Sequence, residues 1–275
     1  MPELPEVETV VRDLRPVLVG RRIVRAWTSP RRLRSGLTPR GSLVGRGITG
    51  IGRRGKWIII DLDRGCALVH LGMTGQLTVG RANQPRDAHV HLTADLDDGR
   101  QLRFRDIRRF GSVRWFADRE RLERFLASRL GPEPWAADRT AFRTSLARTR
   151  RALKAVLLDQ RVLAGVGNIY ADEALFLARL APTRRGCDLA PVEADRLLQT
   201  VGRVLRFAID RRGSSIRNYV GGSGLKGSYQ REFRVYSRAG QPCIRCRSPI
   251  AAIRLCGRTT HFCPKCQQST IDHGA

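Results

Sequence analysis

The stretch GKWIIIDLDRGCALVH (residues 55–70) contains two short apolar runs separated by the turn-forming residues Asp63, Arg64 and Gly65. Runs of this length on either side of such a turn are typical of two paired antiparallel β-strands. Similar runs fill residues 21–117, namely RRIVRAW, CALVHLGMTGQLTV, HVHLTADL, RQLRFRD and GSVRWF. Regular short strands with polar turns between them predict an antiparallel sandwich or barrel.

Helical patterns stand on both sides of this strand-rich region. From Val7 onward apolar residues recur at helical spacing, which predicts a helix from Pro5 to about Val19. Proline suits the first turn of a helix, and acidic residues there complement the helix dipole. After GPEPW (residues 131–135) the same periodicity predicts helices over residues 138–160, 168–180 and 191–212. The glycine-rich stretch YVGGSGLKGSYQ (residues 219–230) predicts a flexible loop.

The C-terminal region has the cysteine spacing of a metal site. Four cysteines follow the pattern C-x2-C-x16-C-x2-C, namely Cys243, Cys246, Cys263 and Cys266. Two such pairs are typical of a tetrahedral zinc site, in which four thiolates leave no open position for catalysis. Disulfides are the alternative, which a cytosolic chain disfavours, and Cys256 and His261 between the pairs are rival ligands. We therefore predict one structural zinc ion per chain, with ordinary core or surface thiols at Cys66 and Cys187.

The net charge indicates a polyanionic partner. Lys and Arg total 51 against 25 Asp and Glu, a formal charge of +26, and the excess is spread along the whole chain. A field of that sign attracts polyanions, of which nucleic acid is the commonest. Biased base composition explains why arginine supplies 47 of the 51 cations, but it does not explain the surplus of cations over anions. The four lysines, Lys56, Lys154, Lys226 and Lys265, then mark positions where a compact ammonium is favoured.

Length and hydropathy limit the class of protein further. The 275 residues, 41% of them hydrophobic, suffice for two domains or for one domain with a small appendage. No stretch is long and apolar enough to cross a membrane, and the acidic N-terminus lacks the apolar region of a secretory signal. We therefore expect a cytosolic, globular protein.

The N-terminal stretch MPELPEVETV (residues 1–10) gathers prolines and acids at the start of a cationic chain. Removal of Met1, the usual processing before a small second residue, exposes the secondary amine of Pro2. Because an α-amine has a pKa of about 8, against about 10.4 for lysine, far more of it is a neutral nucleophile near pH 7. Glu3 and Glu6 are candidates for proton transfer beside this amine, with plain helix capping as the alternative.

Three further motifs favour contact with nucleic acid. The glycine-rich turn LAGVGNIYADE (residues 163–173) opens a helix, and its backbone N–H groups can hold a phosphate. LGMTGQL (residues 71–77) and RDIRRFG (residues 105–111) present Met73, Arg108 and Phe110, which can insert between bases. Core packing is the alternative for Met73 and Phe110. Arg109 is expected to point away from Arg108, because adjacent strand residues face opposite sides.

Together these motifs resemble the formamidopyrimidine-DNA glycosylase family, the Fpg/Nei base-excision repair enzymes. The resemblance covers nearly the whole chain. It rests on MPELPEVETV, RRGKW (residues 53–57), HLGMTG (70–75), DIRRFG (106–111), GVGNIYADE (165–173) and GRTTHFCPKCQ (257–267). MPELPE, HLGMTG and RRFG are similar to the Fpg branch rather than to the bacterial Nei branch.

The resemblance implies a multidomain α+β fold. An N-terminal antiparallel β-sandwich with a leading helix would occupy residues 1–133, and a helix–two-turn–helix DNA-binding domain residues 134–235. A lid loop near residues 217–230 would lie in the second domain, and a four-cysteine zinc finger would follow over residues 236–275. The lid reads LKGSYQ where many relatives carry a Lys-Pro-Gly-Tyr-like stretch, which leaves the range of damaged bases open.

The resemblance also implies a bifunctional DNA glycosylase and abasic-site lyase that acts as a monomer on damaged double-stranded DNA. Such an enzyme would flip an oxidised purine, 8-oxoguanine or formamidopyrimidine, out of the duplex. Pro2 would attack C1′ of the nucleoside and expel the base, and β- and δ-elimination would then cut the strand. Glu3 would protonate the sugar ring oxygen, and Glu6 would order the surroundings of the nucleophile.

The remaining site residues are implied in the same way. Lys56 and Arg258 would be catalytic residues that grip phosphates together with Asn168, with His70 nearby. Met73, Arg108 and Phe110 would fill the gap in the base stack, and Arg108 would read the cytosine opposite the lesion. His89, Lys154 and Lys226 complete the expected DNA contacts. Two alternatives stay open: a glycosylase of the same fold that prefers oxidised pyrimidines, and a non-catalytic DNA-binding zinc protein.

Overall fold

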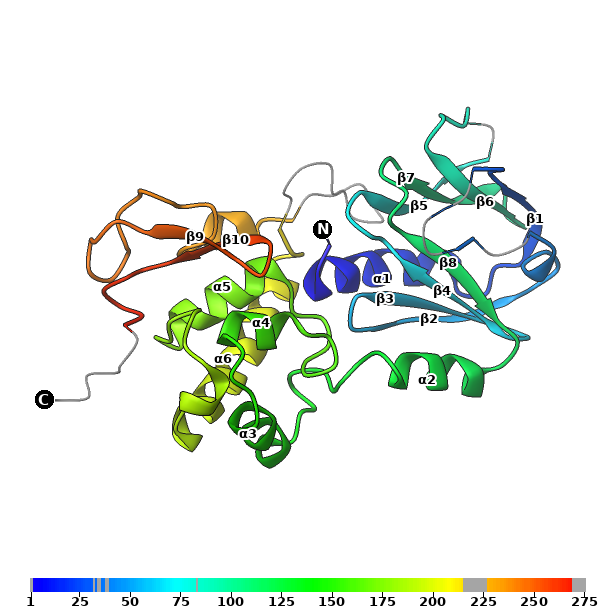
Figure 1. Cartoon of the computed structure of the whole chain (residues 1–275). Helices are drawn as coiled ribbons and strands as arrows, with labels where there is room; N and C mark the ends of the chain where they lie inside the picture. The colour runs from blue at the N-terminus through cyan, green and yellow to red at the C-terminus, as the bar shows by residue number, and fades with distance from the viewer. Residues whose placement is uncertain are drawn as a thin grey trace, which may run out of the picture. The chain divides into compact units, whose positions relative to one another are not determined.

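The computed structural model describes residues 2–268 apart from residues 32, 34, 35, 38, 39, 83 and 215–226. The chain divides into two compact units. The first unit comprises Met1–Ser128 and Ile209–Gln230, and the second comprises Arg129–Ala208 and Arg231–Ala275. Figure 1 labels the helices and strands of both units.

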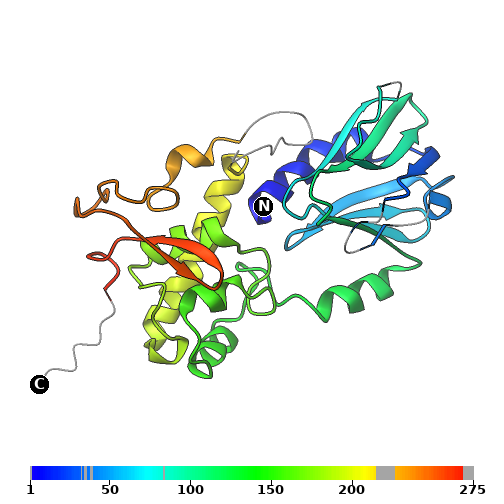
Figure 2. The ribbon, with the colours of Figure 1, turned by 45° about the horizontal axis from the view of Figure 1, so that its top comes forward.

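The first unit contains two four-stranded antiparallel sheets, which confirms the predicted sandwich. Figures 1 and 2 show the two sheets as separate layers, with strand orders β2-β3-β4-β8 and β1-β6-β7-β5. The strands are β1 (Ile23–Thr28), β2 (Ile48–Arg54), β3 (Trp57–Leu62), β4 (Cys66–His70), β5 (Gly75–Arg81), β6 (Val90–Leu96), β7 (Arg100–Asp106) and β8 (Ser112–Phe116).

The leading helix α1 (Leu4–Leu18) shares one hydrophobic core with both sheets. Its apolar residues Val10 and Leu14 are buried together with Ile58 of one sheet and Phe104 of the other. Full burial of such a side chain stabilises the fold by about 1.5–3 kcal/mol. The buried apolar face of α1 therefore stabilises the packing of the helix against both sheets. The predicted helix is confirmed to within one residue at either end.

The run CALVHLGMTGQLTV proved to be two strands in different sheets rather than one strand. β4 pairs with β3 and β8, whereas β5 pairs with β7. Residues 71–74 carry the chain across, with Gly72 at a φ of +61°. A Cβ on Gly75 would lie 2.1 Å from the backbone oxygen of Leu71, so glycine is needed for so tight a turn. Apolar periodicity does not record a change of sheet, which explains the missed break.

Helix α2 (Arg119–Ala127) was not predicted from the sequence. Its N-cap Asp118 accepts the backbone N–H of Arg121 at 2.8 Å, and Arg119 pairs with Glu123 one turn later at 2.8 Å. Only two of its residues, both leucines, are buried. Two apolar positions are too few to show helical periodicity, although Asp118 is a residue type that often caps the start of a helix.

The second unit is helical and ends in a β-hairpin. Its helices are α3 (Arg139–Ala147), α4 (Leu153–Leu158), α5 (Asn168–Leu177) and α6 (Pro191–Asp210), whose last two residues belong to the first unit; its strands are β9 (Ala251–Leu255) and β10 (Arg258–Phe262). Short 3-10 turns lie at Arg40–Ser42 in the first unit, at Gly186–Asp188 in the second, and at Tyr229–Glu232, where the chain passes from the first unit to the second. Within the described residues, no helix combines the length and the apolar character that a membrane span requires.

The helix predicted over residues 138–160 is two helices, α3 and α4, because the segment between them pairs with a distant stretch. The backbone N–H of Leu153 donates to Arg184, that of Gly186 to Arg151, and that of Cys187 to Thr149, all within 3.0 Å. These long-range bonds satisfy backbone groups that a continuous helix would have used internally. Local apolar periodicity does not indicate such long-range hydrogen bonds, so the break between α3 and α4 was not predicted.

Candidate functional site

The start of α1 is held by the Glu6 carboxylate. Glu6 Oε2 accepts the backbone N–H of Glu3 at 2.9 Å, as in a capping box. Glu6 Oε1 accepts the backbone N–H of Ser214 at 2.7 Å and its hydroxyl at 3.0 Å. Pro2, Glu3, Glu6 and Ser214 are all buried. Residues 208 positions apart therefore meet on one carboxylate beside Pro2.

Gly213 makes this junction possible. It has a φ of +71°, and a Cβ there would lie 2.7 Å from Glu6 Oε1. The sequence analysis ended the last predicted helix at residue 212 and selected neither Gly213 nor Ser214 as a site residue. The signal available was the glycine at a helix C-terminus, which indicates a sharp turn but not the partner that the turn brings in.

Lys56 and His70 form a second cluster of the first unit. Lys56 follows Gly55 in the β2–β3 turn and is buried, and Trp57 pairs with His70 across β3 and β4, with ring centroids 4.6 Å apart. Burial, together with the Lys56 charge, lowers the pKa of His70 to about 4. His70 Nδ1 accepts the N–H of Gly72 at 3.1 Å, so the ring proton lies on Nε2. His70 is thus a neutral hydrogen-bond donor near pH 7.

The loops that carry Met73 and Arg108 are joined by the buried carboxylate of Asp106. Asp106 Oδ1 accepts the hydroxyl of Thr74 at 2.5 Å and the backbone N–H of Arg108 at 3.2 Å, while Oδ2 accepts the N–H of Gly111 at 2.8 Å. The N–H of Arg108 also reaches the Thr74 hydroxyl at 3.1 Å. Sequence analysis predicted that both loops contact bases. It did not identify Asp106, whose hydrogen bonds join the two loops.

Side chains at the tips of these loops are available to a ligand. Met73 is 40% exposed, which excludes the alternative that it packs in the core. The Arg108 guanidinium lies 4.7 Å from the centre of the half-buried Phe110 ring. Such a contact holds an arginine over an aromatic face without consuming its hydrogen-bond donors.

The expectation for Arg109 rested on a wrong premise. β7 ends at Asp106, so residues 107–110 form a turn rather than a strand. Arg109 has a φ of +59°, and both Arg108 and Arg109 are exposed. Strand alternation therefore does not decide which of the two arginines faces a ligand.

Two histidines lie beside this turn. The backbone N–H of the half-buried His89 donates to Asp87 Oδ1 at 2.8 Å, and the His89 backbone oxygen accepts the backbone N–H of Asp106 at 2.9 Å. His91, which sequence analysis did not select, is buried, and its Nε2 lies 2.9 Å from the Asp106 backbone oxygen. Both histidines therefore contact the backbone of Asp106, the residue that directly precedes the predicted DNA-contacting turn.

In the second unit, the glycine-rich turn leads into α5 as predicted. Gln160 shapes the turn, because its oxygen accepts the N–H of Gly165 at 2.9 Å and its amide donates to Val166 at 2.9 Å. Asn168 is the first residue of α5, and its side-chain amide donates to the backbone oxygen of Thr259 at 3.0 Å. The turn is therefore attached to the C-terminal hairpin.

Lys154 is not placed for the direct DNA contact that the resemblance implied. Its ammonium is fully buried, forms an ion pair with Asp172 and donates to the backbone oxygen of Asn168 at 3.1 Å. The Lys154 side chain has no exposed surface and its ammonium is held by protein groups, whereas Lys56 keeps 7% exposure, so this geometry gives Lys154 a supporting role behind the turn. Lys226 and most of the expected lid lie outside the described residues.

Arg258 is exposed at the start of β10, directly after a tight turn. The two central residues of the turn, Cys256 and Gly257, both have a positive φ, of 53° and 71°. That combination is typical of the type I′ turns that connect two-residue β-hairpins. The hairpin thus presents the arginine at its tip.

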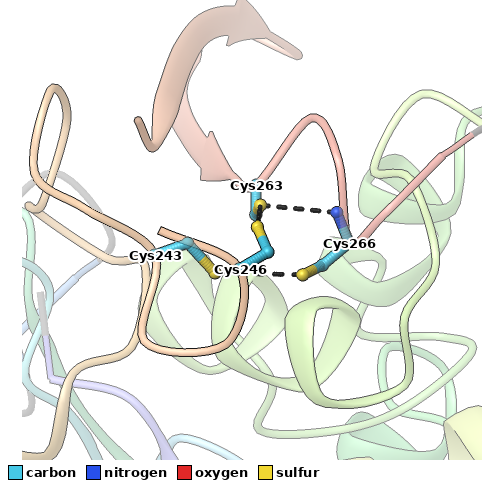
Figure 3. Close-up of side chains that lie close together, drawn as sticks. All are labelled: Cys243, Cys246, Cys263 and Cys266. Carbon is cyan, nitrogen blue, oxygen red and sulfur yellow. Dashed lines mark hydrogen bonds between the residues drawn. The ribbon is translucent and has the colours of Figure 1, made fainter. Parts of the chain in front are cut away.

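The four predicted cysteines fit a zinc ion. Their sulfur atoms lie within 4.8 Å of one another and point toward a common centre (Figure 3). The Sγ atoms of Cys243 and Cys266 are 3.9 Å apart, and those of Cys246 and Cys263 are 3.4 Å apart. Tetrahedral zinc with bonds of about 2.3 Å needs sulfur atoms about 3.8 Å apart.

The rival ligands are excluded by position. Cys256 lies in the exposed hairpin turn, and the His261 ring faces Asp172, with Nδ1 3.4 Å from its carboxylate. Cys243 and Cys263 pack with Phe176 of α5 in a small buried cluster, which anchors the finger to the helical part of the same unit. The zinc is structural, because the four thiolates complete its coordination.

The fold and the site define a multidomain α+β protein, in which a β-sandwich with buried carboxylates near the chain's N-terminus is joined to a helical unit that carries a four-thiolate zinc finger. Three family models match this chain. They are the formamidopyrimidine-DNA glycosylase N-terminal domain over residues 1–113, the formamidopyrimidine-DNA glycosylase H2TH domain over residues 130–220, and the zinc finger found in FPG and IleRS over residues 240–268. The chain belongs to the formamidopyrimidine-DNA glycosylase family.

Individual relatives match nearly the whole chain. A formamidopyrimidine-DNA glycosylase of Chloroflexus aurantiacus is 46% identical over 97% of this chain and 98% of its own length. One of Geobacillus kaustophilus is 40% identical over 98% of this chain and 100% of its own length. The structure of a Lactococcus lactis FPG mutant with Fapy-dG containing DNA has a TM-score of 0.90 and 38% identity, covering 97% of this chain and 100% of the other. A complex between the Lactococcus lactis Fpg and an abasic site containing DNA has a TM-score of 0.89 and 37% sequence identity, and the match covers 97% of this chain and 99% of the other.

Proposed function

We propose that this chain is a bifunctional DNA glycosylase and abasic-site lyase that excises 8-oxoguanine and formamidopyrimidine from duplex DNA. The proposed domains are the catalytic sandwich with its leading helix over residues 1–133, the helix–two-turn–helix domain over residues 134–235 and the zinc finger over residues 236–275. The compact units differ from these bounds, because the second unit begins at Arg129 and Ile209–Gln230 belongs to the first unit. Membership of the family and the likeness to complexes with damaged DNA support this function.

The chemistry centres on the secondary amine of Pro2 after removal of Met1. The nitrogen lone pair attacks C1′ of the damaged nucleoside, the bond from C1′ to the base breaks, and the base leaves with that electron pair. The Pro2 nitrogen loses its N–H proton, Glu3 donates a proton to the sugar ring oxygen, and the bond from C1′ to that oxygen breaks as the nitrogen lone pair forms the iminium. The iminium acidifies C2′, so removal of a C2′ proton expels the 3′ phosphate by β-elimination, and removal of a C4′ proton then expels the 5′ phosphate by δ-elimination.

The observation that carries the proposal is the buried junction at Glu6. A nucleophile and a proton donor at a chain end would normally fray, but the Glu6 carboxylate fixes the Glu3 backbone and Ser214 by three hydrogen bonds. This order gives Pro2 and Glu3 a defined relative geometry, which general acid catalysis needs.

The two units contribute different DNA contacts. In the first, Lys56 and neutral His70 donate to phosphates, Met73, Arg108 and Phe110 fill the space left by the flipped nucleotide, and His89 lies beside them. In the second, Arg258 and Asn168 bind phosphate from neighbouring positions on β10 and α5. Lys154 positions Asn168. The protein acts as a monomer on double-stranded DNA in the cytoplasm, associated with the nucleoid when bound.

Borohydride trapping on an 8-oxoguanine duplex tests the proposal, because reduction of the iminium links protein to DNA covalently. Intact mass first establishes that Met1 has been removed. The wild-type protein should form the adduct and cut the strand, whereas Pro2→Gly and a form that retains Met1 should do neither. Pro16→Ala, which alters an exposed proline of the same helix, is the matched control and should trap normally.

Three outcomes contradict parts of the proposal. Undiminished adduct with the Met1-retaining form would exclude Pro2 as the nucleophile. Tight DNA binding without adduct or strand cleavage would identify a non-catalytic DNA-binding zinc protein. Faster excision of thymine glycol than of 8-oxoguanine in a competition would assign the chain to oxidised pyrimidines.

A further inference from the structure

Two side chains near the N-terminus of α5 contact the outer edge of β10. Asn168 and Asp172 are four residues apart and therefore share one face of the helix. Asn168 donates to the backbone oxygen of Thr259 at 3.0 Å, and Asp172 Oδ2 accepts the backbone N–H of His261 at 3.0 Å. Thr259 and His261 are two residues apart, so these backbone groups lie on one edge of the strand.

The two side chains thus pair with β10 as a neighbouring strand would. Within the described residues β9 is the other neighbour of β10, and it takes the opposite edge. Asp172 is fully buried, and its second oxygen pairs with the buried Lys154 ammonium, which in turn donates to the Asn168 backbone oxygen. Arg258 is the residue immediately before the part of β10 that is held in this way.

We propose that Asp172 is a positioning residue that sets the location of Arg258 by holding β10 against the N-terminal part of α5. The inference rests on the proposed function of Arg258 as a phosphate contact. Asp172 itself is buried and touches no substrate. Its carboxylate provides the acceptor for His261, and Lys154 keeps the negative charge paired inside the unit.

Single substitutions at this pair would leave a buried charge without a partner, so the test uses two double variants. Lys154→Met with Asp172→Asn removes both charges and keeps an oxygen that can accept the His261 N–H. Lys154→Met with Asp172→Leu also removes both charges but leaves no acceptor. Arg143→Met with Asp195→Leu removes another ion pair of the same unit and serves as the matched control.

The first measurement is hydrogen exchange of the His261 amide in zinc-loaded protein, which is independent of DNA. Exchange should stay slow in the Asn variant and in the control, and should accelerate at least tenfold in the Leu variant. Metal analysis should find one zinc ion per chain in all three. Unchanged exchange in the Leu variant would overturn the proposal.

The second measurement is the salt dependence of affinity for an abasic-site duplex, with and without Arg258→Ala. Loss of one phosphate contact reduces the log–log slope by about one. Arg258→Ala should have this effect in the wild-type and Asn backgrounds and no effect in the Leu background, where the contact is already lost. A full further loss in the Leu background would overturn the proposal, because Arg258 would still be in place.

Failure of the underlying function is distinguishable from failure of this inference. If Arg258→Ala changes neither slope nor strand cleavage in the wild-type protein, the proposed role of Arg258 is refuted. The exchange rate of His261 then decides by itself whether Asp172 holds the hairpin.

Discussion

Replacing Asp106 by asparagine tests whether one buried carboxylate places the residues that read the opposite strand. Asp106 accepts hydrogen bonds from Thr74 and Arg108 through Oδ1 and from Gly111 through Oδ2. Asparagine has nearly the same shape but only one acceptor oxygen. Its NH2 group must therefore face either the Gly111 N–H or the Thr74 and Arg108 donors.

The cost follows from this mismatch. A buried donor left without an acceptor costs about 1–3 kcal/mol, and loss of the negative charge weakens the remaining bonds by about 1 kcal/mol. The expected loss is about 2–4 kcal/mol, below the usual 5–15 kcal/mol stability of a domain, so the variant still folds. A change of this size lowers Tm by roughly 5–15 °C in a domain of about 150 residues.

The functional readout is selectivity for cytosine over adenine opposite 8-oxoguanine. A guanidinium that matches the acceptors of cytosine discriminates by about 1–3 kcal/mol, or roughly 5- to 150-fold. Either orientation releases one end of the segment from Arg108 to Gly111, so Asp106→Asn should bring this ratio close to that of Arg108→Ala. Borohydride trapping at an isolated abasic site should change little, because Pro2 and Glu3 are untouched.

The control is Asp98→Asn, because Asp98 also accepts the backbone N–H of the residue two positions later, Arg100. It lies in an exposed turn and should change neither Tm nor selectivity appreciably. Full selectivity in a destabilised Asp106→Asn protein would refute the reasoning, since Asp106 would then stabilise the sandwich without placing Arg108. If the ratio survives Arg108→Ala and collapses in Arg109→Ala, the reading residue is Arg109.

Three other predictions follow from the same geometry. Cys243→Ser should abolish zinc binding and weaken DNA binding, and full zinc content by metal analysis would contradict the ligand assignment. Because burial lowers the pKa of His70 from 6.5 to about 4, unfolding takes up a proton between those pH values, so the free energy of unfolding should fall as pH drops through that window. Urea unfolding at several pH values should show a smaller decrease for His70→Gln, and an identical decrease would exclude His70 as its source. Gly213→Ala forces a side chain into a positive φ and against Glu6, so it should cost about 1–3 kcal/mol and slow base excision, whereas Gly202→Ala, in open space on α6, should not.

The elements that the sequence predicted well are those with local causes. The apolar stripe of α1 and the alternating strands follow from periodicities of a few residues, and the zinc ligands follow from two short cysteine spacings. The short motifs also identified the family, because the residues of each motif are close together in the sequence and can be recognised without the fold. In these cases the residues that determine the structure lie within a few positions of one another in the sequence.

Tertiary structure alone decided how the polar residues of the site are connected. Glu6 meets Ser214 across 208 positions, His261 meets Asp172 across 89, and Thr74 meets Asp106 across 32. It also moved Lys154 from an expected surface contact to a buried ion pair. The physical reason is that a charged or polar side chain can bond many partners equally well in isolation. Burial makes one partner obligatory, and only the folded chain determines which groups are buried together.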